Sequence, residues 1–288
     1  MAKVFLVTGS ARGLGRDIAE AVLAAGHQLV ATARNPERLA DLVTKYGDAI
    51  HPIALDVTDQ EAAEAAVKAA LDTFGRLDVV VNNAGYANLA SVEDFTPEDF
   101  RAQVETNLFG VVNVAKAAVP VLRAQGSGHI INVSSVGGRV TMPGLSAYQT
   151  AKWAVGGFSQ VLAAELAPLG VKVTALEPGG MRTDWAGSSM TVPPISQPYE
   201  ATVGAIAKML DSGFAVAGDP AKVAQVILTL VDLDEPPVRL LLGSDAVIVA
   251  EAAAKAQAES DARWHSLTVS TDHDDVTAQQ LDPLNTRS

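Results

Sequence analysis

Short apolar runs alternate with amphipathic stretches along most of the chain. Val4–Val7 is apolar throughout, as expected for a strand buried on both faces. Between such runs, apolar residues recur at helical spacing, as in Ile18 and Val22. Regular alternation of this kind predicts an α/β fold: a single Rossmann-type, doubly wound, mostly parallel seven-stranded sheet with helices on both faces. The other six strands are expected at Gln28–Thr32, Ile50–Leu55, Leu77–Val81, His129–Val133, Val171–Leu176 and Arg239–Leu242.

Capping and breaking residues set the expected helix boundaries. Asp59 can cap an alanine-rich helix that runs to Phe74, with Gly75 just beyond its end. A long helix is expected from Pro97 towards Arg123. Another is expected over Tyr148–Leu166, where the candidate chemistry lies.

Two segments depart from the alternation. Residues 183–214 are rich in Ser, Pro and Gly, and the sequence predicts a long irregular segment that acts as a substrate lid. Beyond residue 243 we expect an alanine-rich helix over about Asp245–Trp264 and then a polar tail. The predicted organisation is therefore one Rossmann domain over 1–243, lid included, and a C-terminal helix and tail over 244–288.

Composition narrows the classes of partner. The chain has 288 residues, 48% hydrophobic, and a net charge of -12, so the basic surface typical of nucleic-acid binding is not expected. No apolar run is long enough to span a membrane and there is no cysteine, so we expect a cytoplasmic protein. The histidines show no metal-ligand spacing, and the acidic end around His273 is read as a solvated terminus; no metal is expected.

A glycine-rich turn follows the first strand directly and opens a helix. In this context Gly9 allows a tight turn, Gly13 lets the backbone approach a pyrophosphate, and Gly15 allows close helix packing. The helix N-terminus offers free N–H groups to phosphate oxygens. The sequence therefore predicts a dinucleotide site at Gly9, Ser10, Arg12, Gly13, Leu14 and Gly15.

The end of the second strand favours NADP(H) over NAD(H). NAD sites place an acidic side chain there for the ribose 2′-hydroxyl, whereas NADP sites supply arginine. This chain has Ala33 followed by Arg34, and Arg12 projects from the glycine loop. Guanidinium groups are well shaped to bind a 2′-phosphate. Either arginine could instead be an ordinary surface charge.

Tyr148 and Lys152 are four residues apart on one helix and so share a face. Reduction of a ketone by hydride leaves negative charge on oxygen, which an acid must meet. A free tyrosine has a pKa of about 10, and a neighbouring ammonium is expected to lower that pKa. Ser135, at the end of the fifth strand, would donate a second hydrogen bond. Singly, each of these residues has an ordinary structural explanation.

Taken together, these motifs resemble those of the classical short-chain dehydrogenase/reductase family. The resemblance covers residues 1 to about 183 and rests on matching motifs in the expected order: Thr8-Gly9-x-x-x-Gly13-x-Gly15, Asn82-Asn83-Ala84-Gly85, Asn107, Ser135, Tyr148-x-x-x-Lys152 and Pro178-Gly179.

The resemblance implies roles that spacing alone does not. Lys152 would also hold the nicotinamide ribose, and Asn107 would anchor a water relay behind it. Tyr148 and Lys152 would thus serve both catalysis and cofactor binding, and the family is commonly dimeric or tetrameric. Further cofactor contacts are implied at Asp56, Val57, Asn83, Ala84, Gly85, Pro178, Gly179, Met181 and Thr183.

The predicted activity is NADP(H)-dependent hydride transfer to or from a carbonyl or secondary alcohol. A non-catalytic NADP-binding redox sensor on the same fold is the alternative, although such a protein would lack the Tyr/Lys pair. A serine hydrolase would need Gly-x-Ser-x-Gly, which is absent. The candidate pocket residues are mostly apolar, which predicts a small apolar substrate: Tyr86, Leu89, Val140, Met142, Leu145, Trp185, Met190 and Tyr199.

Overall fold

A single parallel sheet forms the centre of the molecule. The structure, a computed structural model, describes residues 2–182, 190–212 and 216–282. Its seven strands follow the order β3-β2-β1-β4-β5-β6-β7, and each neighbouring pair is parallel, which confirms the predicted fold. The strands are β1 (Val4–Val7), β2 (Gln28–Ala33), β3 (Ile50–Ala54), β4 (Val79–Asn82), β5 (Gly128–Val133), β6 (Val171–Pro178) and β7 (Arg239–Leu242).

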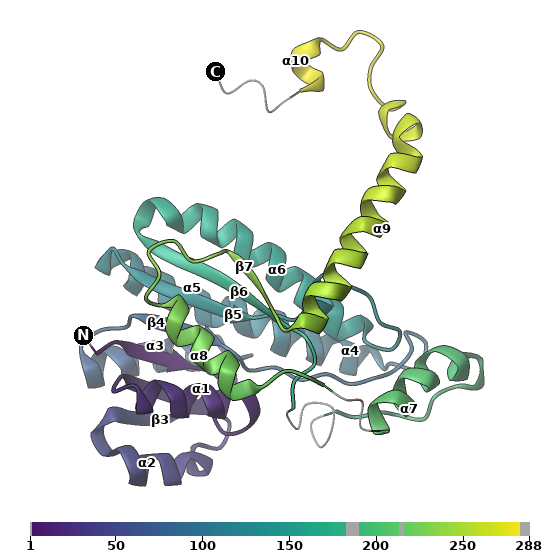
Figure 1. The fold of residues 1–288 in the computed structure, drawn as a ribbon. Helices are drawn as coiled ribbons and strands as arrows, with labels where there is room; N and C mark the ends of the chain where they lie inside the picture. Colours follow the sequence, from purple (N-terminus) through teal and green to yellow (C-terminus); the bar gives the residue numbers. More distant parts are fainter. Residues whose placement is uncertain (1, 183–189, 213–215, 283–288) are drawn as a thin grey trace.

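Helices connect the strands and cover both faces (Figure 1). The helices are α1 (Gly13–Ala24), α2 (Ala40–Tyr46), α3 (Gln60–Phe74), α4 (Pro97–Val104), α5 (Gly110–Gln125), α6 (Ser146–Leu166), α7 (Ala205–Asp211), α8 (Pro220–Leu230), α9 (Ser244–Val269) and α10 (Ala278–Leu281). Short helical turns are η1 (Pro36–Leu39), η2 (Gly47–Ala49), η4 (Val136–Gly138), η5 (Ala167–Leu169) and η7 (Gln197–Tyr199), and π-helical turns are η3 (Glu105–Phe109) and η8 (Glu200–Gly204).

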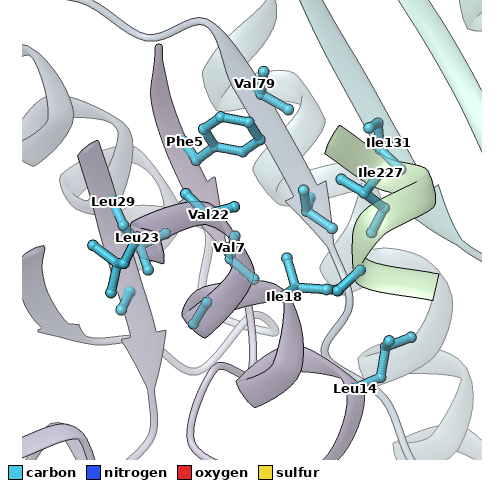
Figure 2. Packing of buried hydrophobic residues seen from close by; sticks show 14 of the residues in the cluster. Phe5, Val7, Leu14, Ile18, Val22, Leu23, Leu29, Val79, Ile131 and Ile227 are labelled. Atoms are coloured by element: carbon cyan, nitrogen blue, oxygen red, sulfur yellow. The ribbon is translucent and has the colours of Figure 1, made fainter. Parts of the chain in front are cut away.

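The strand β1 is apolar throughout because both faces of the sheet are buried at its position. In β1, Phe5 and Val7 pack with α1 and α8 on one face, as Figure 2 shows, whereas Val4 and Leu6 pack with α3, α5 and α6 on the other. Burial of alternate residues in opposite cores explains why no polar residue interrupts this strand.

The chain reverses its direction of travel across the sheet after β3, so that β4 pairs with β1 on the side opposite β2. In open α/β sheets a crevice forms at such a switch point, outside the carboxyl ends of the strands. The loops after β1 and β4 meet there, where Thr8 N donates to Val81 O at 2.9 Å. This edge of the sheet carries the candidate site.

The segment predicted to be irregular over 183–214 is partly helical. Residues 183–189 and 213–214 lie outside the described residues, but the chain forms η7, η8 and α7 between Gln197 and Asp211. Val203, Ile206, Ala207 and Leu210 have helical spacing and pack against an apolar cluster that includes Tyr148. The prediction was wrong here because the Ser- and Pro-rich composition of residues 191–198 concealed this short apolar face.

The C-terminal helix leaves the body of the molecule. Only Ala246 and Ala250 of α9 are buried, and the helix then projects away from the sheet and its helices (Figure 1). It continues to Val269, beyond the end expected at Trp264. Within the described part of the chain, we find no helix with the length and apolarity needed to cross a membrane.

Candidate active site

Tyr148 and Lys152 lie in the first two turns of α6, and their side chains are buried. Lys152 Nζ lies 5.6 Å from the centre of the Tyr148 ring and donates to Val133 O at 2.7 Å. Because Val133 ends β5, this hydrogen bond fixes the start of α6 against the carboxyl edge of the sheet. The helix spacing thus brings the phenol and the ammonium together, as predicted.

Ser135 lies just after β5 and caps the turn η4. Its Oγ accepts a hydrogen bond from Gly137 N at 3.0 Å. Ser135 also forms a side-chain hydrogen bond with Tyr148 that lowers the pKa of the phenol. Ser135, Tyr148 and Lys152 therefore form one constellation.

Burial dominates the titration of this pair. Burial raises the pKa of Tyr148 to about 12, despite the opposing hydrogen bond from Ser135. Burial also lowers the pKa of Lys152 to about 8. The expectation that the ammonium sets a depressed pKa for Tyr148 was wrong, because removal from water disfavours both charged forms. Tyr148 consequently holds its proton at neutral pH.

Asn107 lies in the π-helical turn η3 and is fully buried. Its amide nitrogen donates to Tyr86 O and Gln103 O, both at 2.8 Å. Gly85 separates it from Lys152: a Cβ added at Gly85 would lie 2.5 Å from Asn107 Oδ1 and 3.7 Å from Lys152 Nζ. Asn107 thus lies behind Lys152, and the relay role remains a prediction.

The N-terminus of α1 fits a phosphate group. No side chain caps it, and its first turn has no acidic residue, so its N–H groups face a site without negative charge. Gly15 lies so close to the preceding turn that an added Cβ would be 2.2 Å from Gly9 O and 2.4 Å from Asn83 Nδ2. Thr8 Oγ1 accepts from Asn83 N and Ala84 N at 2.9 and 3.0 Å, which joins the loops after β1 and β4.

Two exposed arginines stand at the other end of this crevice. Arg12 precedes α1, and Arg34 follows β2. The pKa of Asp56 is lowered by hydrogen bonds from Thr58 and, to a smaller extent, by the charge of Arg34. Burial is the main cause that raises the pKa of Tyr86. Tyr86, a candidate pocket residue, is not among the residues of the apolar cluster that includes Tyr148.

Several of the residues predicted to contact the cofactor have side chains that bond to or pack against other parts of the protein. Ser10 Oγ donates to Val7 O at 2.8 Å, and Leu14, Val57 and Met181 pack in the two apolar cores. These residues could therefore reach a cofactor through their backbone. Pro178 ends β6 and Gly179 N donates to Leu242 O at 2.9 Å, whereas Thr183 lies outside the described residues.

An apolar cluster lies beside Tyr148. It joins residues from the loop after β4, the start of α6 and the helices before α8: Ala87, Leu89, Met142, Leu145, Met190, Ile195, Tyr199, Val203, Ile206, Ala207 and Leu210. Five candidate pocket residues are therefore brought together, namely Leu89, Met142, Leu145, Met190 and Tyr199. Val140 is not part of this cluster, and Trp185 falls outside the described residues.

Two acidic residues near the site were missed in the sequence. Glu177 is fully buried and pairs with Arg139 and Arg239. Asp245, in the first turn of α9, accepts from Gly180 N at 2.8 Å. The available signal for Glu177 was a charged residue inside the apolar half of β6, between Leu176 and Pro178. The described residues contain no cluster of three or more metal-ligand side chains.

Comparison with known proteins identifies the family. The family model for short chain dehydrogenases matches residues 3–191. The chain belongs to the short-chain dehydrogenase family. This short-chain dehydrogenase is 57% identical over 274 residues to oxidoreductase BOA17 of Botryotinia fuckeliana, covering 94% of this chain and 100% of that protein. It is therefore a member of a family of oxidoreductases.

Solved structures agree with this assignment. A short-chain dehydrogenase from Streptomyces avermitilis matches with a TM-score of 0.89 and 38% identity, over 95% of this chain and all of that one. Alcohol dehydrogenase from Thermococcus sibiricus, with 5-hydroxy-NADP, matches with a TM-score of 0.69 and 29% identity, over 84% of this chain and 96% of that one. A 3-ketoacyl-(acyl-carrier-protein) reductase from Brucella melitensis, with NADH, matches with a TM-score of 0.71 and 28% identity. The match covers 83% of this chain and 96% of that one. A nicotinamide cofactor is thus supported for this short-chain dehydrogenase.

Proposed function

We propose that the protein is an NADP(H)-dependent oxidoreductase that interconverts a carbonyl and a secondary alcohol on a small apolar substrate. The observation that carries this proposal is the constellation of the buried Tyr148 and Lys152 with the partly buried Ser135, beside an apolar cluster. The bound nicotinamide supplies or accepts the hydride. A redox sensor without catalysis would have no use for a buried proton donor at this point.

The chain's own residues handle the proton and the developing charge. Tyr148, with its pKa raised by burial, keeps its proton until the carbonyl oxygen gains charge, and then donates it. Ser135 would donate a second hydrogen bond to the same oxygen by turning its single hydroxyl hydrogen from Tyr148 to the substrate. Lys152 holds a positive charge close to both, and Asn107 lies where a water relay behind Lys152 would begin.

The apolar cluster favours a substrate without charge. Leu89, Leu145 and Val203 are buried next to Tyr148, and Met142 and Met190 pack against them. A charged substrate would lose its hydration there without a partner. We propose that the helices of residues 197–211 form a lid over the nicotinamide end, because they supply part of this apolar wall.

The preference for NADP(H) rests on the end of β2. Ala33 is followed by the exposed Arg34, so no carboxylate stands where an NAD site places one. The influence of Arg34 on Asp56 and Tyr86 supports its position at the adenosine end of the crevice. The cytoplasmic location and the homodimer or homotetramer expected from the sequence remain predictions.

The test is a panel of neutral ketones and alcohols assayed by NADPH absorbance, followed by the ratio of kcat/KM for NADPH over NADH. Arg34→Leu should lower this ratio by about tenfold or more, because a charge-assisted hydrogen bond contributes about 1.5–3 kcal/mol. Ala33→Asp is a poor reversal variant since Ala33 is buried; Arg34→Asp is preferable. Arg123→Leu, at the exposed end of α5, is the control. A wild-type ratio below one would contradict the NADP(H) proposal.

A further inference from the structure

A buried carboxylate lies next to the catalytic turn. Glu177 is fully buried in β6, immediately before Pro178. An Nη of Arg139 lies 2.5 Å from its Oε2, and Arg239 Nε donates to its Oε1 at 2.8 Å, with a second, shorter contact from Arg239 Nη2. One carboxylate therefore pairs with two partly buried guanidinium groups. Arg239 makes charge-assisted hydrogen bonds to Oε1, which are strong and directional, whereas Arg139 makes an ion pair with Oε2 that lacks hydrogen-bond geometry.

The two arginines reach Glu177 from different elements. Arg139 directly follows η4, and Arg239 opens β7. Arg239 Nη2 also donates to Gly138 O at 3.5 Å. The end of the turn that begins at Ser135 is thus held on one side through Arg139 and on the other through Arg239.

This turn determines where the Ser135 hydroxyl lies. Gly138 N donates to Ser135 O at 2.9 Å, and Gly137 N donates to Ser135 Oγ at 3.0 Å. The turn also lies against the backbone of α6, because a Cβ at Gly138 would be 2.8 Å from Lys152 O. A small shift of the Gly137–Arg139 end would consequently move Ser135 relative to Tyr148.

A structural bridge between β6 and β7 would not by itself require charges. Burial of a carboxylate costs free energy, and replacing a buried ion network with packed apolar side chains is often neutral or stabilising. Here one partner of the carboxylate is the residue that ends the catalytic turn. A positioning role therefore explains features that the strand contact leaves unexplained.

We propose that Glu177 is a positioning residue, which acts through Arg139 and Arg239 to hold the Ser135–Arg139 turn so that the Ser135 hydroxyl faces Tyr148. The inference rests on the proposed function, in which Ser135 and Tyr148 meet the substrate oxygen. It adds three residues to the catalytic apparatus, none of which touches the reacting atoms.

The experiment is a double-mutant cycle between Arg139→Gln and Ser135→Ala. Arg139→Gln is the main variant because Glu177 stays paired with Arg239, so no buried charge loses all of its partners. It should lower kcat by about tenfold or more, since small displacements of a catalytic group have large effects. The KM for NADPH should change by less than about twofold. In the Ser135→Ala background, Arg139→Gln should have little further effect on kcat.

The pH profile provides a readout that a purely structural role would not move. The hydrogen bond from Ser135 lowers the pKa of Tyr148, so its loss should raise that pKa. The alkaline limit of ketone reduction should therefore move to higher pH in both Arg139→Gln and Ser135→Ala. Glu177→Gln should show the same shift, and Arg139→Lys should restore part of kcat.

Asp78→Asn is the matched control. Asp78 binds Arg76 and accepts from Val4 N at 2.8 Å, but it lies at the amino end of the sheet. It should lower the melting temperature without changing the pH profile. Normal kcat in Arg139→Gln with impaired Ser135→Ala, or effects that multiply in the double variant, would overturn the positioning role alone. An unimpaired Ser135→Ala would overturn both the proposed function and this inference.

Discussion

Lys152 Nζ donates to the carbonyl oxygen of Val133 at 2.7 Å, which ties the helix α6 to the last residue of β5. This contact directs the ammonium under the Tyr148 ring, 5.6 Å from its centre. The same burial that fixes this geometry acts against the charge of the lysine, whose pKa falls to about 8. The burial that holds Lys152 beside Tyr148 therefore lowers the stability of the folded protein while the lysine is charged.

Tyr148→Phe should abolish turnover, with a loss in kcat of at least about 100-fold, because the proposed proton donor is removed. The ring still fills its buried position, so the dissociation constant for NADPH should stay within about twofold of wild type. Single-turnover kinetics and fluorescence titration measure the two quantities. Tyr46→Phe in α2, remote from the site, is the control. Retention of a tenth or more of wild-type activity would remove Tyr148 from the acid role.

Lys152→Met should weaken NADPH binding and yet raise the melting temperature at pH 7. The pKa of Lys152 is about 8 in the folded protein, against 10.5 for a lysine side chain free in water, as in the unfolded chain. Below pH 8 both states carry the proton, and the folded state bears the cost of burying it. Between these values only the unfolded state keeps the proton, so wild-type stability rises with pH.

The stability advantage of Lys152→Met should consequently shrink from pH 8 towards pH 10.5. Thermal unfolding followed by circular dichroism across this range measures the trend. Lys172→Met, which removes a lysine near the start of β6, is the comparison variant. A variant less stable than wild type at pH 7 would mean that the bond to Val133 outweighs the cost of burial.

Gly15→Ala and Gly157→Ala should change stability in opposite directions. A Cβ at Gly15 would overlap backbone and amide atoms at 2.2 and 2.4 Å, so that the glycine loop must move and NADPH binding should weaken. A Cβ at Gly157 meets nothing within 4 Å, and alanine there should stabilise α6 by about 0.5–1 kcal/mol. Urea unfolding measures both, and equal effects at the two positions would contradict the close packing at Gly15.

We expect the first turns of α9 to be needed for activity, and the exposed remainder of this helix, called the arm here, to be dispensable. Asp245→Ala leaves Gly180 N without its acceptor, at a cost of about 1–3 kcal/mol, and should raise the KM for the nicotinamide cofactor. A chain that ends after Ala250 should keep wild-type kcat and melting temperature, because nearly all described residues beyond it are exposed. A marked loss of activity on this truncation would show that the arm has a partner in the working enzyme.

The sheet was predictable because strands that are buried on both faces appear in the sequence as short runs of apolar residues. The expected and observed strands agree closely, as at Val4–Val7 and Arg239–Leu242. The helices at 200–211 were missed because their apolar face is short and becomes meaningful only when packed against Leu89 and Leu145. Tertiary contact, more than local preference, determines that part of the chain.

The site was predictable in its geometry and less so in its energetics. Four-residue spacing placed Tyr148 and Lys152 together, as the structure has them. The direction of the Tyr148 pKa shift depends on how deeply the ring is buried, which the spacing of two residues does not reveal. The Glu177 cluster joins residues far apart in the chain, and its local sign in the sequence was a charge in the apolar half of β6.

Gly218 N donates to Gly180 O at 2.9 Å, and Arg182 N donates to Gly218 O at 3.1 Å, so the chain leaves and rejoins the core at a single point. The stretch between these bonds can therefore vary in length and composition without altering the register of β6 or the start of α8. Evolution could exchange it as a cassette, and a laboratory could graft the corresponding stretch of a relative between the same two anchor points. Under the proposed function, such chimeras would take the hydride chemistry from one parent and the selection of substrate from the other.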